Sequence, residues 1–156
     1  MIILRELKNS DEEYFFKFIK NLSKEIVENY NHLFSEKREE WAKKLLSENS
    51  LKIIVLDDSK NEIIGFGHLT INKEYPGVPS LGIVINQNYR GKGIGKQIMQ
   101  KLMEEGKTKK FKAIYLSVFK KNTIAKKLYD SLGFKTIGET FNDSGESWKM
   151  RYDFPI

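Results

Sequence analysis

Residues 81–103 read LGIVINQNYRGKGIGKQIMQKLM. The first five residues, which end at Ile85, have the length and the β-branched content typical of a buried strand. A turn-forming patch follows at residues 86–88, and a glycine-rich loop comes next. Beyond the glycines, apolar residues recur at helical spacing: Ile94, Ile98, Met99, Leu102 and Met103. This pattern predicts a strand, a glycine loop and a helix in succession.

Such a loop can bind an anion. The first amides of a helix have no partner within the helix and carry the positive end of its dipole. Glycines leave these amides uncovered, so that a phosphate can bind directly to them. Arg90, Lys92 and Lys96 add positive charge around the same place. The alternative is a tight strand-to-helix turn that needs glycine only for its backbone angles.

Two common phosphate loops do not match. A Walker loop requires Ser or Thr after its Gly-Lys pair, whereas Gln97 follows Gly95-Lys96 here. The dinucleotide fingerprint requires Gly-x-Gly-x-x-Gly and an acidic residue roughly 20 positions further on. The chain instead has alternate glycines, and the region around Tyr115 contains no carboxylate. We therefore expect neither a P-loop nor a dinucleotide site.

The pattern Arg/Gln-x-x-Gly-x-Gly does match, at Arg90, Gly93 and Gly95. It resembles the acyl-CoA pyrophosphate loop of the GNAT (GCN5-related N-acetyltransferase) superfamily. The resemblance implies acetyl-CoA as cosubstrate. The loop residues that it assigns to the cofactor are Arg90, Gly91, Lys92, Gly93, Ile94, Gly95 and Lys96.

The composition limits the other possibilities. The chain has 156 residues, of which 40% are hydrophobic and 31% charged, as is ordinary for a soluble globular protein. Cysteine is absent, and the only histidines are His32 and His68, so we expect no disulfide, no cysteine nucleophile and no metal site. Since no apolar run approaches the roughly 20 residues of a membrane span, we expect no membrane association and a cytoplasmic location.

The net charge of +6 has several possible sources. An anionic cofactor such as CoA accounts for part of it, and a lysine-rich surface that favours solubility accounts for more. Nucleic-acid binding is a third source, but it calls for aromatic residues on an exposed strand face. Phe111, Tyr115 and Phe119 alternate instead in an apparently interior strand, so we do not expect nucleic acid as a partner.

The whole chain predicts an α/β fold with one mixed sheet, about four helices on its two faces, and a single domain over residues 1–156. A capping Ser10 is expected to start the first helix. In the strand at residues 62–72, Gly65 and Gly67 fall on one face, and Phe66 and His68 on the other. The order of elements is that of the GNAT fold. Strands are expected at residues 2–7, 51–56, 62–72, 81–85, 111–119, 135–141 and 147–154, and helices at 10–20, 36–48, 94–103 and 122–132, with residues 21–34 irregular.

A second signature lies in residues 122–134, NTIAKKLYDSLGF, which resemble the GNAT stretch Asn-x-x-Ala-x-x-x-Tyr-x-x-x-Gly-Phe. On a helix, one side carries Asn122, Ala125, Lys126 and Tyr129. Another side carries the expected core stripe of Ile124, Leu128 and Leu132. Tyr129 is about 100° from the centre of that stripe, so it need not be a core residue.

The resemblance implies direct transfer of the acetyl group to a primary amine of a small molecule or protein. The pantetheine arm would pair with Ile83, Val84 and Ile85 where two parallel strands part, and an amide near Ile85 would stabilise the oxyanion. Asn122 would bind the pantetheine and Lys126 the cofactor. Tyr129 would protonate the departing thiolate.

The base and the acceptor stay open. Many GNAT enzymes have a glutamate where this chain has Ser80, which could only hold a water, and His68 and Glu74 are the alternatives. An acyl-CoA sensor without catalysis is therefore a second interpretation. The oligomeric state is expected to be a monomer or a homodimer. Residues 21–34 and 75–79 are expected to shape the acceptor pocket, where the acids Glu25, Glu28, Glu36, Glu39 and Glu40 would suit a cationic amine.

Overall fold

A computed structural model describes residues 1–31, 37–143 and 145–156. Its seven strands form one sheet in the order β1-β2-β3-β4-β5-β7-β6. All neighbours pair antiparallel except β4 and β5, which run parallel. The strands are β1 (Ile2–Glu6), β2 (Ser50–Asp57), β3 (Glu62–Thr70), β4 (Ser80–Ile85), β5 (Ala113–Phe119), β6 (Lys135–Asn142) and β7 (Gly145–Asp153).

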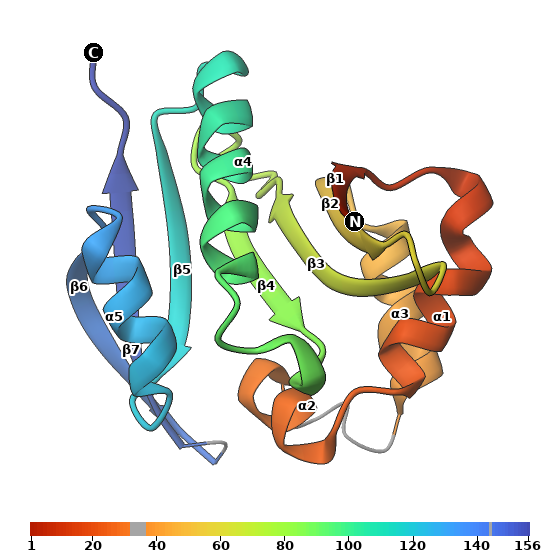
Figure 1. The fold of residues 1–156 in the computed structure, drawn as a ribbon. Coiled ribbons are helices and arrows are strands. Elements are labelled where there is room, and N and C mark those ends of the chain that lie inside the picture. The colour runs from red at the N-terminus through yellow and green to blue at the C-terminus, as the bar shows by residue number, and fades with distance from the viewer. Residues whose placement is uncertain (32–36, 144) are drawn as a thin grey trace.

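The sheet opens between β4 and β5. Among the described residues, the ladder between these strands holds a single pair, Ser80 with Tyr115, at the start of β4. On the other side of β4, β3 pairs with the whole of β4, from Ser80 to Ile85. Figure 1 shows β4 and β5 moving apart toward their carboxyl ends. The predicted splay of the two parallel strands is therefore confirmed.

Helices cover both faces of the sheet. The helices α1 (Glu12–Lys20), α2 (Lys24–Asn31) and α3 (Arg38–Ser47) pack on one face, and α4 (Ile94–Thr108) and α5 (Thr123–Ser131) on the other. Each face has its own apolar core. Phe15, Trp41, Ile54 and Phe66 are buried in the core beneath α1 to α3, and Ile53, Ile98, Leu102 and Met150 in the core beneath α4 and α5.

The predicted mixed α/β class and the order of elements are confirmed, with one helix more than expected. The described residues contain five α-helices, because α2 occupies the segment that we expected to be irregular. Ile26, Val27 and Tyr30 form a helical stripe in α2 that is short for recognition from sequence. Ser23 caps the helix, because its hydroxyl accepts from the amide of Ile26 at 3.2 Å.

The expected cap of the first helix is wrong. A 3-10 turn, Asn9–Asp11, comes before α1, and Ser10 is not the capping residue. The carboxylate of Asp11 instead accepts from the amide of Lys8 at 2.7 Å and from the guanidinium of Arg5 at 2.7 and 2.8 Å. Because a carboxylate carries charge, Asp11 makes stronger hydrogen bonds to such donors than the neutral hydroxyl of Ser10 would. The helix expected at residues 36–48 is α3, which begins at Arg38, and Glu36 lies outside the described residues.

The predicted two faces of β3 are confirmed. Gly65 and Gly67 lie beneath Ile98 of α4. Phe66 and His68 point to the opposite face, where their rings stack with centroids 5.5 Å apart. The missing side chains on one face let α4 approach the sheet closely, and this fixes the position of the α4 amino terminus beside the open end of β4.

Candidate active site

The glycine loop has a backbone that requires glycine. Gly91 and Gly93 have φ angles of 76° and 77°, in the left-handed region that other residues rarely adopt. Gly93 is also the N-cap of α4. A β-carbon built on either residue would meet nothing within 4 Å, so the space over these amides is open. The first turn of α4 therefore presents uncovered N–H groups to an anion.

Positive side chains surround this loop. Arg90, Lys92 and Lys96 are all exposed, as an anion site requires. The loop is held by Tyr89, whose hydroxyl donates to Asp57 at the end of β2 at 2.8 Å. Hydrogen bonds from Ser59 first, and then from Tyr89, lower the pKa of Asp57. Sequence reasoning missed this anchor because Tyr89 and Asp57 are 32 positions apart.

The three β4 residues assigned to the pantetheine divide between the two faces of the sheet. Val84 is buried beneath α1 to α3, whereas Ile83 and Ile85 pack toward α4. Their backbone atoms lie in the part of β4 beyond its single pair with β5. Ile94, assigned to the loop, has its side chain buried in the core beneath α4, so only its backbone faces the loop.

Gly95 lets three elements meet closely at the start of α4. A β-carbon on Gly95 would lie 3.2 Å from Cδ1 of Ile85 and 3.5 Å from Cδ2 of Leu128. The third glycine of the motif therefore serves packing between α4, β4 and α5. The chain brings the glycine loop and α5 to the same end of the sheet.

In α5 the two polar residues assigned to the cofactor already have partners. The side-chain oxygen of Asn122 accepts from the amide of Ala125 at 3.3 Å and caps the helix. The ammonium of Lys126 contacts both carboxylate oxygens of Asp130, at 2.9 and 2.8 Å. A cofactor phosphate would have to share Lys126 with Asp130.

The expected core stripe of α5 is partly wrong. Ile124 is 78% exposed, whereas Tyr129 is 7% exposed and belongs to the core beneath α4. The stripe in contact with the sheet is Ala125, Leu128, Tyr129 and Leu132, which has regular helical spacing. The sequence did not predict this stripe, because Ala125 has only a small side chain and gives a weak apolar signal. Burial raises the pKa of Tyr129, so its phenol stays protonated at neutral pH.

The three candidate bases occupy different environments. Ser80 and Glu74 are exposed. His68 is buried, and both of its ring nitrogens have partners: the hydroxyl of Tyr30 at Nε2 and Thr70 Oγ1, 2.8 Å away, at Nδ1. Burial, and then the charge of Lys52, lower the pKa of His68 to about 4. Sequence reasoning missed Tyr30, because α2 itself was not predicted.

The segment expected to shape the acceptor pocket is tied to the end of β4. Gln87 accepts from the amide of Ser23 at 2.9 Å and donates to the carbonyl of Asn21 at 3.1 Å. Two of the acids proposed for a cationic acceptor lie beside lysines. Glu28 is 3.8 Å from Lys24, and Glu39 is 3.3 Å from Lys43. Residues 32–34 of the segment lie outside the described residues.

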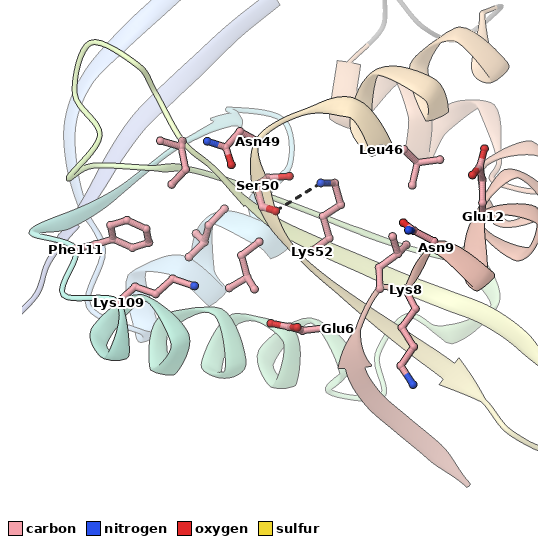
Figure 2. A pocket seen from close by; sticks show the side chains of 14 residues that line it. Glu6, Lys8, Asn9, Glu12, Leu46, Asn49, Ser50, Lys52, Lys109 and Phe111 are labelled. Carbon is pink, nitrogen blue, oxygen red and sulfur yellow. Dashed lines mark hydrogen bonds between the residues drawn. The ribbon is translucent and has the colours of Figure 1, made fainter.

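A hollow among the described residues lies elsewhere in the fold. It has a volume of about 600 Å³ and is lined by charged and polar residues that include Glu6, Lys8, Lys52 and Lys109 (Figure 2). Lys109 follows the last residue of α4, whereas the glycine loop precedes the first. The 15 residues of α4 separate the two places by about 22 Å. This hollow is therefore not the site that the glycine loop defines.

The described residues contain no group of three or more His, Cys, Asp or Glu side chains that could hold a metal ion. Within the same residues, no helix is both long enough and apolar enough to cross a membrane.

Comparison with known proteins identifies the class. The model of the acetyltransferase (GNAT) family matches residues 5–134, and the chain belongs to this family. The spermine/spermidine N(1)-acetyltransferase of Bacillus subtilis is 33% identical over 87 residues, which cover 51% of this chain and 57% of that protein. The uncharacterized N-acetyltransferase YobR of the same species is 32% identical over 80 residues, 51% of this chain and 32% of that protein. The chain thus spans about half of one curated relative and a third of the other.

Solved structures show the same fold. The spermidine N-acetyltransferase of Vibrio cholerae, in complex with CoA and spermine, has a TM-score of 0.76 and 21% identity, and the match covers 97% of this chain and 95% of that one. A GNAT superfamily phosphinothricin acetyltransferase from Sinorhizobium meliloti, in complex with AcCoA, has a TM-score of 0.78 and 18% identity, with coverage of 97% and 88%. At these identities the likeness concerns the fold.

Proposed function

We propose that this chain is a single-domain N-acetyltransferase that moves the acetyl group of acetyl-CoA directly to a primary amine. The observation that carries the proposal is the left-handed Gly91 and Gly93 at the open amino terminus of α4, beside the gap between β4 and β5. Uncovered amides suit a pyrophosphate, and the edge of β4 beyond Ser80 suits an extended acyl arm. Family membership supports the same activity.

Each side chain then has a role that follows from its position. Arg90, Lys92 and Lys96 attract the phosphates of CoA from exposed positions. Backbone groups of residues 83–85 hold the pantetheine, and an amide near Ile85 donates to the oxyanion. The attacking amine forms the new C–N bond, and the thiolate of CoA leaves.

Tyr129 is proposed to assist the departing thiolate. The raised pKa of Tyr129 keeps the phenol protonated. It also lies further above the pKa of a thiol, which is roughly 8.5. A full transfer of the proton before the C–S bond breaks is therefore unfavourable. Tyr129 instead donates a hydrogen bond that strengthens as negative charge develops on the sulfur.

The acceptor class is proposed to be a small cationic amine. The Bacillus relative is named for spermine and spermidine, and the Vibrio structure contains spermine. Glu25 and Glu40 are exposed acids on α2 and α3, near the segment that Gln87 ties to β4. A polyamine therefore belongs in the panel of acceptors, together with amino acids and an alanine-terminated peptide.

Calorimetric titration with acetyl-CoA and CoA, followed by thiol release against this panel, tests the proposal. We expect binding of both cofactors and amine-dependent release of thiol. Binding without release for any amine would favour the second interpretation, an acyl-CoA sensor, which Ser80 in place of the usual glutamate favours. The absence of heat with either cofactor would contradict both the acetyltransferase and the acyl-CoA sensor.

A further inference from the structure

A chain of four polar side chains crosses the face of the sheet beneath α1 to α3. The hydroxyl of Tyr30, from α2, is hydrogen-bonded to Nε2 of His68 in β3. Nδ1 of His68 is 2.8 Å from Oγ1 of Thr70, and this hydroxyl donates to Oε2 of Glu48 at 3.3 Å. The four groups come from three separate parts of the chain and form one continuous hydrogen-bonded path.

The donors in this path point in one direction. A carboxylate only accepts hydrogen bonds, so the hydroxyl of Thr70 uses its proton on Glu48. The oxygen of Thr70 must then accept from Nδ1–H of His68. In a neutral ring this leaves Nε2 bare, so it accepts the proton of Tyr30. Every O–H and N–H therefore points away from Tyr30 and toward Glu48.

The surroundings of His68 keep its ring neutral. Burial in the sheet face is the first cause of its lowered pKa, and the charge of Lys52, paired opposite it in β2, is the second. Among the described residues, the phenol of Tyr30, the phenyl ring of Phe66 and the hydroxyl of Thr70 also contact the ring. A ring with one bare nitrogen and one N–H can pass a proton from one side to the other.

The Tyr30 end of the path lies against β4. A β-carbon built on Gly82 would lie 2.4 Å from Nε2 of His68 and 2.6 Å from the hydroxyl oxygen of Tyr30. Any side chain at position 82 would therefore displace this pair. Gly82 directly precedes residues 83–85, the part of β4 proposed to hold the pantetheine.

Tyr30 packs against the core beneath α1 to α3, whereas the proposed acid Tyr129 belongs to the core on the other face of the sheet. The pKa of Tyr30 is raised mainly by burial, with smaller contributions from Glu48 and Tyr129.

We propose that Tyr30, His68, Thr70 and Glu48 form a relay that removes the proton of the acceptor ammonium during the acetyl transfer proposed above. The N–H bond of the ammonium breaks as Tyr30 takes that proton, and the proton of Tyr30 moves to Nε2 of His68. The Nδ1 proton of His68 moves to Thr70, and that of Thr70 to Glu48. One proton travels in total, and the half-buried Glu48 releases it to water.

In this relay Tyr30 is the catalytic residue, and the other three act through it. A primary amine with a pKa near 10.4 is protonated at pH 7, so it cannot attack until that proton has left. The relay carries that proton from the acceptor to the half-buried Glu48. The relay serves as the general base, for which the sequence left Ser80, His68 and Glu74 as candidates.

Two variants break the relay and leave the cofactor site intact. Thr70→Val has nearly the same shape but has no hydroxyl, and Glu48→Gln keeps an acceptor oxygen but takes up no proton. We expect each to lower kcat for a polyamine at least tenfold at pH 7. The Kd for acetyl-CoA should not change. Thr70→Ser, which keeps the hydroxyl, should restore the rate.

The pKa of the acceptor amine separates proton removal from a structural role. With an acceptor amine whose pKa lies below 7, the variants should match the wild-type rate, because no proton has to be removed before attack. An equal loss for all amines would overturn the relay, as would full turnover of Thr70→Val and Glu48→Gln with a polyamine. A wild-type protein that binds acetyl-CoA and acetylates no amine would overturn the proposed function as well.

Nitrogen-15 NMR of the imidazole tests the same relay without turnover. We expect a neutral ring protonated at Nδ1 at pH 7, with that tautomer preference lost in Thr70→Val. The chain has only two histidines, so His68→Asn assigns the signal. A ring protonated at Nε2, or one that is charged at pH 6, would contradict the proposed direction of the hydrogen bonds.

Discussion

Gly67 of β3 lies directly beneath Ile98 of α4: a β-carbon at position 67 would be 2.3 Å from Cγ2 of Ile98. It would also be 3.0 Å from Cδ1 of Leu102. The absence of a single side chain thus sets the distance between α4 and the sheet. Because the glycine loop leads into α4, this contact also positions the proposed cofactor site.

Replacing Gly67 by Ala should destabilise the protein by about 1–3 kcal/mol, because the added methyl group overlaps Ile98 and the core has to shift. Urea unfolding measures the effect. Gly138→Ala is the matched control, since a β-carbon at position 138 meets nothing within 4 Å. Equal stabilities of the two variants would contradict the close approach of α4.

Replacing Gly93 by Val should abolish binding of acetyl-CoA. The β-branched side chain is strained at a φ of 77°, and it would cover the amides at the start of α4. Calorimetry measures binding, and circular dichroism verifies the fold. Gly138→Val, which adds the same side chain to the edge strand β6, should bind as the wild type does. If Gly93→Val binds acetyl-CoA as tightly as the wild type, the glycine loop is not part of the cofactor site.

Replacing Tyr129 by Phe should lower kcat by roughly 10²-fold and leave the Kd for acetyl-CoA nearly unchanged, because only the hydrogen bond to the departing sulfur is lost. Steady-state thiol release measures kcat. Tyr152→Phe provides the comparison, since the rings of both Tyr129 and Tyr152 pack near Phe134. If the two variants are equally active, Tyr129 does not assist the departing thiolate.

Replacing Lys126 by Ala should weaken acetyl-CoA binding severalfold, by less than about 1 kcal/mol, because Lys126 is also engaged by Asp130 at the surface. The loss should shrink as salt is added. Lys43→Ala removes a similar ion pair, between residues four apart in α3, and should leave the affinity unchanged. If the wild type and Lys126→Ala bind acetyl-CoA with equal affinity at low salt, Lys126 does not contact the cofactor.

Replacing Asp11 by Asn should remove a stabilisation that depends on pH. Hydrogen bonding to Arg5 is the main cause of the lowered pKa of Asp11, so the carboxylate stabilises the fold above its unfolded pKa of about 3.9. This contribution disappears as pH falls through the folded pKa. The variant should therefore be less stable than the wild type at pH 7, by roughly 1–3 kcal/mol. At a pH below the folded pKa of Asp11 the two should be nearly equal in stability. A constant difference in unfolding free energy across that range would contradict this assignment.

The sequence was sufficient for the fold wherever periodicity was strong. The strand, glycine loop and helix from Leu81 onward were predicted in the correct order, and the alternation in β3 placed Gly67 and His68 on opposite faces. The helix α2 was missed because three apolar residues within eight give little periodic signal. Ser10 has the residue type of a helix cap, but the charged Asp11 beside it makes the stronger hydrogen bonds.

The site was only partly accessible from sequence. The glycine loop is local in the chain, so its residues could be named in advance. The pairing of Tyr30 with His68 joins positions 38 apart, and that of Tyr89 with Asp57 joins positions 32 apart. Such contacts depend on how the helices cross the sheet. Tyr129 was assigned to the chemistry on its motif, but its burial could not be seen because Ala125 hides the stripe.

The most direct test of the account follows the acetyl group itself. Acetyl-CoA labelled in the acetyl carbon is mixed with the protein and an accepting amine, and mass spectrometry locates the label. We predict one labelled N-acetyl amine for each thiol released, and no label on the protein with or without amine. A labelled protein, or thiol release without a labelled amine, would contradict direct transfer.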